Sequence, residues 1–87
     1  METQMQNETE NLDYYTSSDL GCCSSLLASG FKLLGIEKSD PRRAFFCFER
    51  SAALEQAVND YWSDNMQVNA RDLVDSIKKL KERIYGE

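Results

Sequence analysis

The feature that most constrains the fold of this chain is a pair of apolar segments that flank a turn. FKLLGIEK (residues 31–38) precedes the turn sequence SDPR, and RAFFCFE (residues 43–49) follows it. In the turn, Pro41 fixes its own backbone angle and Asp40 can hydrogen-bond locally, so the chain most simply folds back on itself. The two segments are therefore predicted to pair as a β-hairpin.

The second segment contains three phenylalanines whose positions assign them to two faces. Successive strand residues point to opposite sides, so Phe46 and Phe48 share one face with Ala44, whereas Phe45 shares the other with Cys47. We predict that Phe46 and Phe48 lie in the core and that Phe45 is partly covered. The alternatives are rings that stack on nucleotide bases, or an exposed patch for a protein partner that includes Phe45.

The same alternation assigns the apolar residues of the first segment to two strand faces. Leu34 and Ile36 are expected on one face, and Phe31 and Leu33 on the other. Gly35 interrupts the strand, which indicates a bulge or a close backbone approach.

A short strand at residues 12–15 and a helix are predicted before the hairpin. Thr16 or Ser17 would cap this helix, with Asp19 in its first turn. Gly30 would end the helix after about twelve residues, because glycine readily adopts the left-handed conformation found there. The apolar stripe consists of Cys22, Cys23, Leu26 and Leu27.

Two further helices are predicted after the hairpin. The first begins at Ser51, and the last runs from the cap residue Asn69 to about Tyr85. Their apolar stripes are Leu54, Val58, Tyr61 and Trp62 in the former, and Leu73, Ile77, Leu80 and Ile84 in the latter, widened by Val74.

These elements predict an α+β fold in the order β-α-β-β-α-α, with helices packed on a small antiparallel sheet built on the β-hairpin. A chain of 87 residues supports one hydrophobic core, so residues 12–87 are expected to form a single α+β domain. Residues 1–11 are polar and lack aromatic side chains. Their contacts cannot offset the entropy of ordering, which predicts a disordered acidic tail.

Charge and hydropathy limit the cellular compartments in which the protein is expected. The net charge of −5 comes from five acidic residues before position 20, whereas residues 21–87 contain ten basic and ten acidic residues. There is no apolar run of about 18 residues and no basic segment followed by an apolar one near the amino terminus. The sequence predicts a cytoplasmic protein with no membrane contact.

The chain has few of the residue types that commonly act in catalysis or bind metals. The chain has three cysteines, Cys22, Cys23 and Cys47, and no histidine. Neighbouring Cys22 and Cys23 lack the spacing of a zinc site, and no base is present to activate a serine or cysteine nucleophile. We expect buried structural thiols, no catalytic residues, no metal and no cofactor, and hence no enzymatic activity.

Several motifs resemble a known family when taken in order. TSSDL, LLASGFKLLGIEKSDPRRAFFCFE, AVNDYW and VNARDLVDSIKKLKERIY follow one another over residues 14–85. This arrangement resembles a family of small bacterial and phage proteins catalogued only as a domain of unknown function. The resemblance implies a shared fold and assigns no activity or site residues.

Six residues are candidates for contact with a partner. Arg42 and Arg43 lie beside the predicted hairpin tip, where basic side chains could reach phosphates or could form a solvated turn. The other candidates are Phe45, Trp62, Lys78 and Lys81.

Trp62 is predicted to pack under the last helix, or alternatively to anchor a partner. We expect a non-enzymatic interaction or accessory module with a protein partner, present as a monomer or homodimer. The alternative is a nucleic-acid-binding module that uses the hairpin arginines and the basic last helix.

Overall fold

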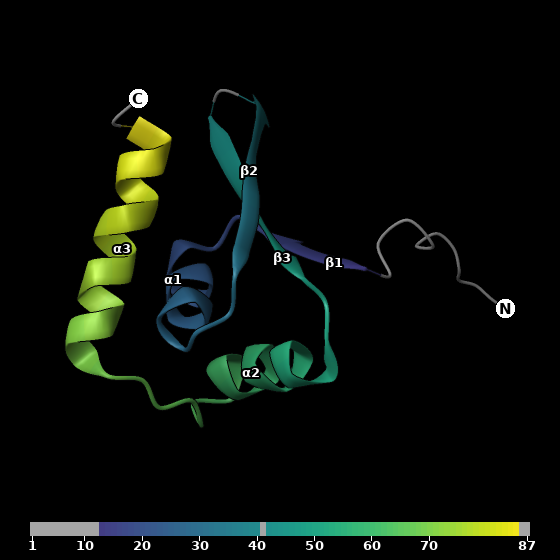
Figure 1. Ribbon diagram of the computed structural model, residues 1–87, viewed down its shortest axis with the longest axis vertical. Coiled ribbons are helices and arrows are strands. Elements are labelled where there is room, and N and C mark those ends of the chain that lie inside the picture. Colours follow the sequence, from purple (N-terminus) through teal and green to yellow (C-terminus); the bar gives the residue numbers. More distant parts are fainter. Residues whose placement is uncertain (1–12, 41, 86–87) are drawn as a thin grey trace, which may run out of the picture.

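The computed structural model describes residues 13–40 and 42–85, so the predicted tail at residues 1–11 lies outside the described part (Figure 1). The predicted order β-α-β-β-α-α and the antiparallel sheet are confirmed. The elements are β1 (Tyr14–Ser17), α1 (Leu20–Ala28), β2 (Leu33–Asp40), β3 (Arg43–Glu49), α2 (Ala52–Trp62) and α3 (Ala70–Tyr85).

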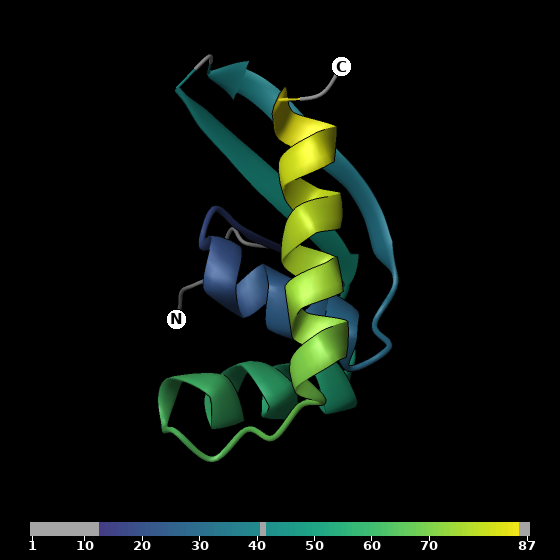
Figure 2. The same ribbon diagram turned by 90° about the vertical axis from the view of Figure 1, so that its left-hand side faces the viewer.

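The sheet has the order β1-β3-β2, so the strand with the three phenylalanines is central. Figure 2 shows α3 in front, α1 behind it and the sheet at the back, so the helices are layered on one side of the sheet. Helix α1 packs against both α2 and α3. The other face of the sheet has no helix on it among the described residues (Figures 1 and 2).

The core forms where α1 covers β3. Phe46 and Phe48 are 1% and 0% exposed, as the strand alternation predicts. They pair across the sheet with Ser17 and Tyr15 of β1. The buried hydrophobic cluster comprises Cys22, Cys23, Leu26, Phe46, Phe48, Leu54 and Leu80.

The bulge predicted at Gly35 is present, but it changes the faces of β2. Leu33 and Ile36 pair with the two buried phenylalanines, and the register shifts between Leu33 and Gly35. Leu34, the extra residue, is 45% exposed. The prediction that Leu34 and Ile36 share a face is therefore wrong, because one inserted residue reverses the alternation on one side of it.

Helix α1 starts later than predicted. Thr16 and Ser17 pair with β3 and belong to β1, so neither is the cap. Asp19 is the cap instead: its carboxylate accepts a hydrogen bond from the Cys22 amide at 2.8 Å. At the other end Gly30 has a φ of 103°, which confirms the predicted end of the helix.

Close packing of α1 against α2 depends on a residue without a side chain. A Cβ atom placed on Gly21 would lie 2.5 Å from the Tyr61 hydroxyl oxygen. Gly21 weakens the helical propensity of α1, and its hydrogen makes room for the Tyr61 ring from α2.

Candidate functional site

A groove of about 670 Å³ is lined by residues near the tip of the β2–β3 hairpin and at the carboxyl end of α3. These two elements lie at the top of Figure 1. Its basic lining residues are Lys38, Arg42 and Arg43. The apolar and aromatic lining comes from Leu20, Ala44, Phe46, Ile84 and Tyr85, with Ser18 at the start of α1. No acidic side chain lines the groove among the described residues.

The groove exists because the hairpin extends beyond the helix that covers it. Ser18 and Leu20, at the start of α1, form one boundary of the groove. The inward face of β3 continues from Phe46 through Ala44 toward the tip, where α1 no longer covers it. The carboxyl end of α3 stands opposite this uncovered part (Figure 1).

A hydrogen bond links the two walls of the groove. Lys38 Nζ in β2 donates to the Ile84 carbonyl oxygen in the last turn of α3, at 3.1 Å. The last carbonyls of a helix have no partner within the helix, and a cation is favourable at this negative end of the helix dipole. Lys38 therefore links the hairpin near its tip to the end of α3.

The structure brings four of the six candidate residues to one side of the molecule. Arg42 and Arg43 line the groove. Lys78 and Lys81 are exposed on α3, seven and four residues before Tyr85, which also lines the groove. Residues spaced by three, four or seven positions share one side of a helix, so both lysines extend the basic surface away from the groove.

The other two candidates lie elsewhere. Phe45 pairs with Glu37 and is half-buried on the sheet face opposite the buried phenylalanines. Trp62 ends α2, which lies at the opposite end of the molecule from the groove (Figure 1).

The predicted packing of Trp62 under α3 is wrong. Its side chain is 59% exposed and meets the Tyr61 ring edge-on, with 4.9 Å between ring centroids. Helix α1, and not α2, forms the main surface against which α3 packs, so the end of α2 receives little cover.

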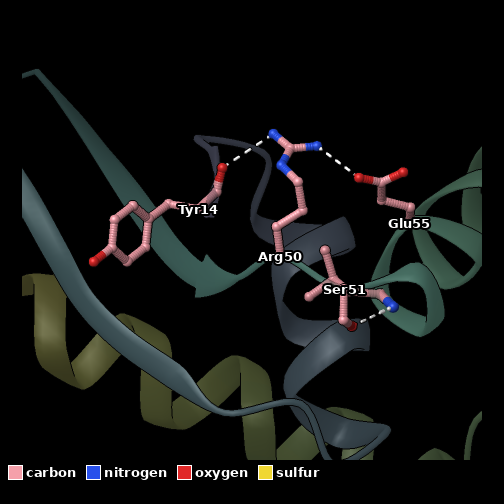
Figure 3. Close-up of polar contacts among 5 residues, drawn as sticks. Tyr14, Arg50, Ser51 and Glu55 are labelled. Atoms are coloured by element: carbon pink, nitrogen blue, oxygen red, sulfur yellow. Dashed lines mark hydrogen bonds and ion pairs between the residues drawn. The ribbon is translucent and has the colours of Figure 1, made fainter. Parts of the chain in front are cut away.

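Sequence reasoning missed the role of Arg50, which joins three elements (Figure 3). Its guanidinium donates to the Tyr14 carbonyl oxygen at 3.0 Å and to the Glu55 carboxylate at 3.1 Å. Its backbone amide donates to the Asp13 carbonyl oxygen at 2.8 Å. The contacts with Tyr14 and Asp13 hold the short edge strand β1. Arg50 and Tyr14 are 36 positions apart along the chain, so no local sequence pattern indicates this contact.

The buried thiols of α1 are poorly suited to chemistry. Burial raises the pKa of Cys23 from 9.0 to about 12, although a hydrogen bond with Ser17 opposes the shift. Burial also raises the pKa of Cys22 and, together with the neighbouring Cys22, that of Tyr15 to about 12. A thiol that stays protonated is a weak nucleophile, which supports a structural role for both cysteines.

Metal-ligand groups and membrane spans can be assessed for the described part of the chain. Within residues 13–40 and 42–85, no three His, Cys, Asp or Glu side chains lie close enough together to hold a metal ion. None of the helices within these limits combines the length and apolar character needed to cross a bilayer.

Comparison with known proteins gives a family and no activity. The family model described as a domain of unknown function (DUF5659) matches residues 12–86, which confirms the resemblance to a family of that kind. Neither the curated proteins nor the solved structures contain a match to the chain. Any functional assignment must therefore come from the geometry of the groove.

Proposed function

Because the chain belongs to the DUF5659 family of domains of unknown function, whose description assigns no activity, we propose from the geometry that it is a non-enzymatic protein-interaction module. The partner binds in the groove between the hairpin tip and the end of α3. The observation that supports this proposal is the combination of three basic side chains with an apolar floor in one groove.

The composition of the groove favours a protein over a small substrate. The groove is open along the surface between two elements, and its floor offers Leu20 and Ile84 to apolar side chains. Arg42 and Arg43 can direct guanidinium donors at carboxylates, an arrangement that suits the polar edge of a protein interface. Interfaces of this kind combine an apolar centre with a charged periphery.

A non-enzymatic role agrees with the state of the cysteines. Cys22 and Cys23 are fully buried and their pKa values are raised, so neither thiol is available as a nucleophile. The three cysteines are free, which fits a reducing compartment. We place the protein in the cytoplasm.

A nucleic-acid-binding module remains the second candidate, supported by one observation. The hairpin arginines and Lys81 lie on the same side of the molecule, where they could contact successive phosphates. Against this reading, Phe46 and Phe48 are buried and cannot stack on bases. Stacking rings are a main source of affinity for single-stranded nucleic acids.

Site-specific photo-crosslinking in the native host tests the proposal. A benzophenone side chain at Tyr85, which is exposed in the groove, should crosslink to a defined polypeptide. The matched control position is Ala53, exposed on α2, where the same polypeptide should not be captured. The crosslink from position 85 should be resistant to nuclease and should weaken when Arg42 and Arg43 are replaced by Ala.

Other outcomes would overturn the proposal in identifiable ways. A crosslinked species that disappears on nuclease treatment would favour the nucleic-acid candidate. Capture from position 53 alone, or from neither position, would show that the groove is not a protein-binding site.

A further inference from the structure

Helix α3 presents a second stripe beside the one that packs on the core. The core-facing residues Leu73, Ile77, Leu80 and Ile84 are spaced by four, three and four positions. One residue further along, Val74, Lys78, Lys81 and Tyr85 repeat the same spacing. We call these four residues the flank stripe. Because one residue turns a helix by about 100°, the flank stripe runs parallel to the core stripe on the adjacent side.

The flank stripe has apolar ends and a basic middle. Val74 and Tyr85, its two ends, are 49% and 78% exposed, among the most exposed large hydrophobic residues. Lys78 and Lys81 are also exposed. Neither lysine has a hydrogen bond or ion pair with another residue in the described part of the chain. The stripe therefore presents apolar surface and cationic charge that have no partner among the described residues.

The flank stripe and the groove form one continuous surface. Tyr85 belongs to both, since it ends the stripe and lines the groove beside Ile84. Arg42 and Arg43 face this end of α3 from the hairpin tip. A ligand that lies along α3 from Val74 to Tyr85 would thus meet two lysines first and two arginines at the end.

The order of apolar and basic residues along this surface matches one kind of partner. A helix that lies in a hydrophobic groove places anchor side chains at spacings of three and four residues, which is the spacing of the flank stripe itself. The stretch from Val74 to Tyr85 is about 17 Å long at 1.5 Å per residue, equal to about three helical turns. Carboxylates on the partner would pair with Lys78 and Lys81 and approach the guanidinium groups at the hairpin tip, and its apolar side chains would cover Val74 and Tyr85.

We infer that the ligand of this surface is an acidic amphipathic helix of a partner protein, docked along the flank stripe with one end in the groove. This inference rests on the proposed function and specifies its ligand. A nucleic acid would use the four basic residues but would gain nothing from Val74, an aliphatic side chain at the far end of the stripe.

The test uses the full chain and a synthetic probe. The probe is a fluorescent 18-residue peptide in which Glu and Leu follow the three- and four-residue spacing of an amphipathic helix. The first control peptide has the same composition in scrambled order, and the second has Lys in place of every Glu. Fluorescence anisotropy should show binding of the probe, with weaker binding of the scrambled peptide and none of the basic one.

Charge reversal on the stripe identifies the binding surface. The double variant Lys78→Glu, Lys81→Glu should bind the probe roughly tenfold more weakly, as expected for two lost exposed ion pairs and added repulsion. The same variant should gain affinity for the basic peptide, and an unchanged circular dichroism spectrum should show that it is folded. Trp62→Ala, at the far end of the molecule, should leave probe binding unchanged.

Four results would overturn the inference. Equal binding of the scrambled peptide would mean that charge alone is recognised. Tighter binding of a single-stranded oligonucleotide than of the probe would assign the surface to nucleic acid. If Lys78→Glu, Lys81→Glu has no effect while Arg42→Ala, Arg43→Ala abolishes binding, the groove remains a binding site and the flank stripe does not. Likewise, a polypeptide crosslinked from position 85 that the probe cannot displace would leave the proposed function intact and refute only the helical ligand.

Discussion

The two halves of the β2–β3 hairpin differ in what covers them. In the half beside α1, the inward rings of Phe46 and Phe48 are fully buried. Toward the tip, Arg42 and Arg43 are exposed and the inward face opens into the groove. The comparison shows that strand pairing extends the sheet further than the helices can cover it. One half of the hairpin therefore serves stability, and the other provides the groove in which we propose that a partner binds.

The largest expected effect is on the free energy of unfolding, and it distinguishes the two faces of β3 in the half of the hairpin that α1 covers. Phe48→Ala should lower the free energy of unfolding by about 3–5 kcal/mol, because a fully buried ring leaves a cavity. Phe45→Ala should cost about 1 kcal/mol, since this half-buried ring lies on the opposite face. Urea denaturation measures both values. Equal losses would mean that the outer face is as tightly packed as the inner one.

The second largest effect is expected at alkaline pH and again concerns the covered half. The pKa values of Cys23 and Tyr15 rise from 9.0 and 10.0 to about 12 in the folded protein. Their contribution to stability is complete below pH 9 and is lost as the pH rises to 12, because the unfolded chain releases these protons first. Denaturation curves between pH 8 and 12 should show this decline.

Replacement of the buried thiol provides the control for the pH effect. Cys23→Ala should reduce the slope of stability against pH between 9 and 12, since one of the shifted groups is removed. An unchanged slope in Cys23→Ala would contradict the assignment of part of the pH dependence to the raised pKa of Cys23.

A smaller effect of opposite sign is expected at a buried hydroxyl in α1. Ser24 Oγ is buried without a hydrogen-bond partner among the described residues. Ser24→Ala should therefore stabilise the protein by about 1 kcal/mol, through removal of an unsatisfied polar group and better helical propensity. Ser25 is the matched control, because its hydroxyl donates to the Gly21 carbonyl oxygen at 2.8 Å. Ser25→Ala should give no such gain in thermal denaturation.

The smallest effect on stability is expected in the half of the hairpin that lines the groove. Arg43→Ala should change the free energy of unfolding by less than about 0.5 kcal/mol, since the side chain is exposed at the hairpin tip. The same variant should weaken partner binding in the crosslinking experiment. A loss of stability comparable with that of Phe48→Ala would mean that the tip belongs to the core.

The sequence alone determined the order and type of the elements. The alternation around Phe46 and Phe48 predicted which rings are buried, and Gly30 and Asn69 predicted the end of α1 and the start of α3. At these positions Gly30 has positive φ and the Asn69 side chain accepts a hydrogen bond from the Asp72 amide at 3.0 Å. Periodicity and capping depend on residues only a few positions apart, so they can be recognised before the chain is folded.

Only the tertiary structure decided which surfaces remain uncovered. The exposure of Trp62 and the reversed faces of Leu33 and Leu34 depend on packing and on the strand register. The contacts of Arg50 and the hydrogen bond from Lys38 to Ile84 join residues 36 and 46 positions apart. The groove forms between two such distant elements, the hairpin tip and the carboxyl end of α3. Its position follows from how far α1 extends along the sheet, which no local pattern specifies.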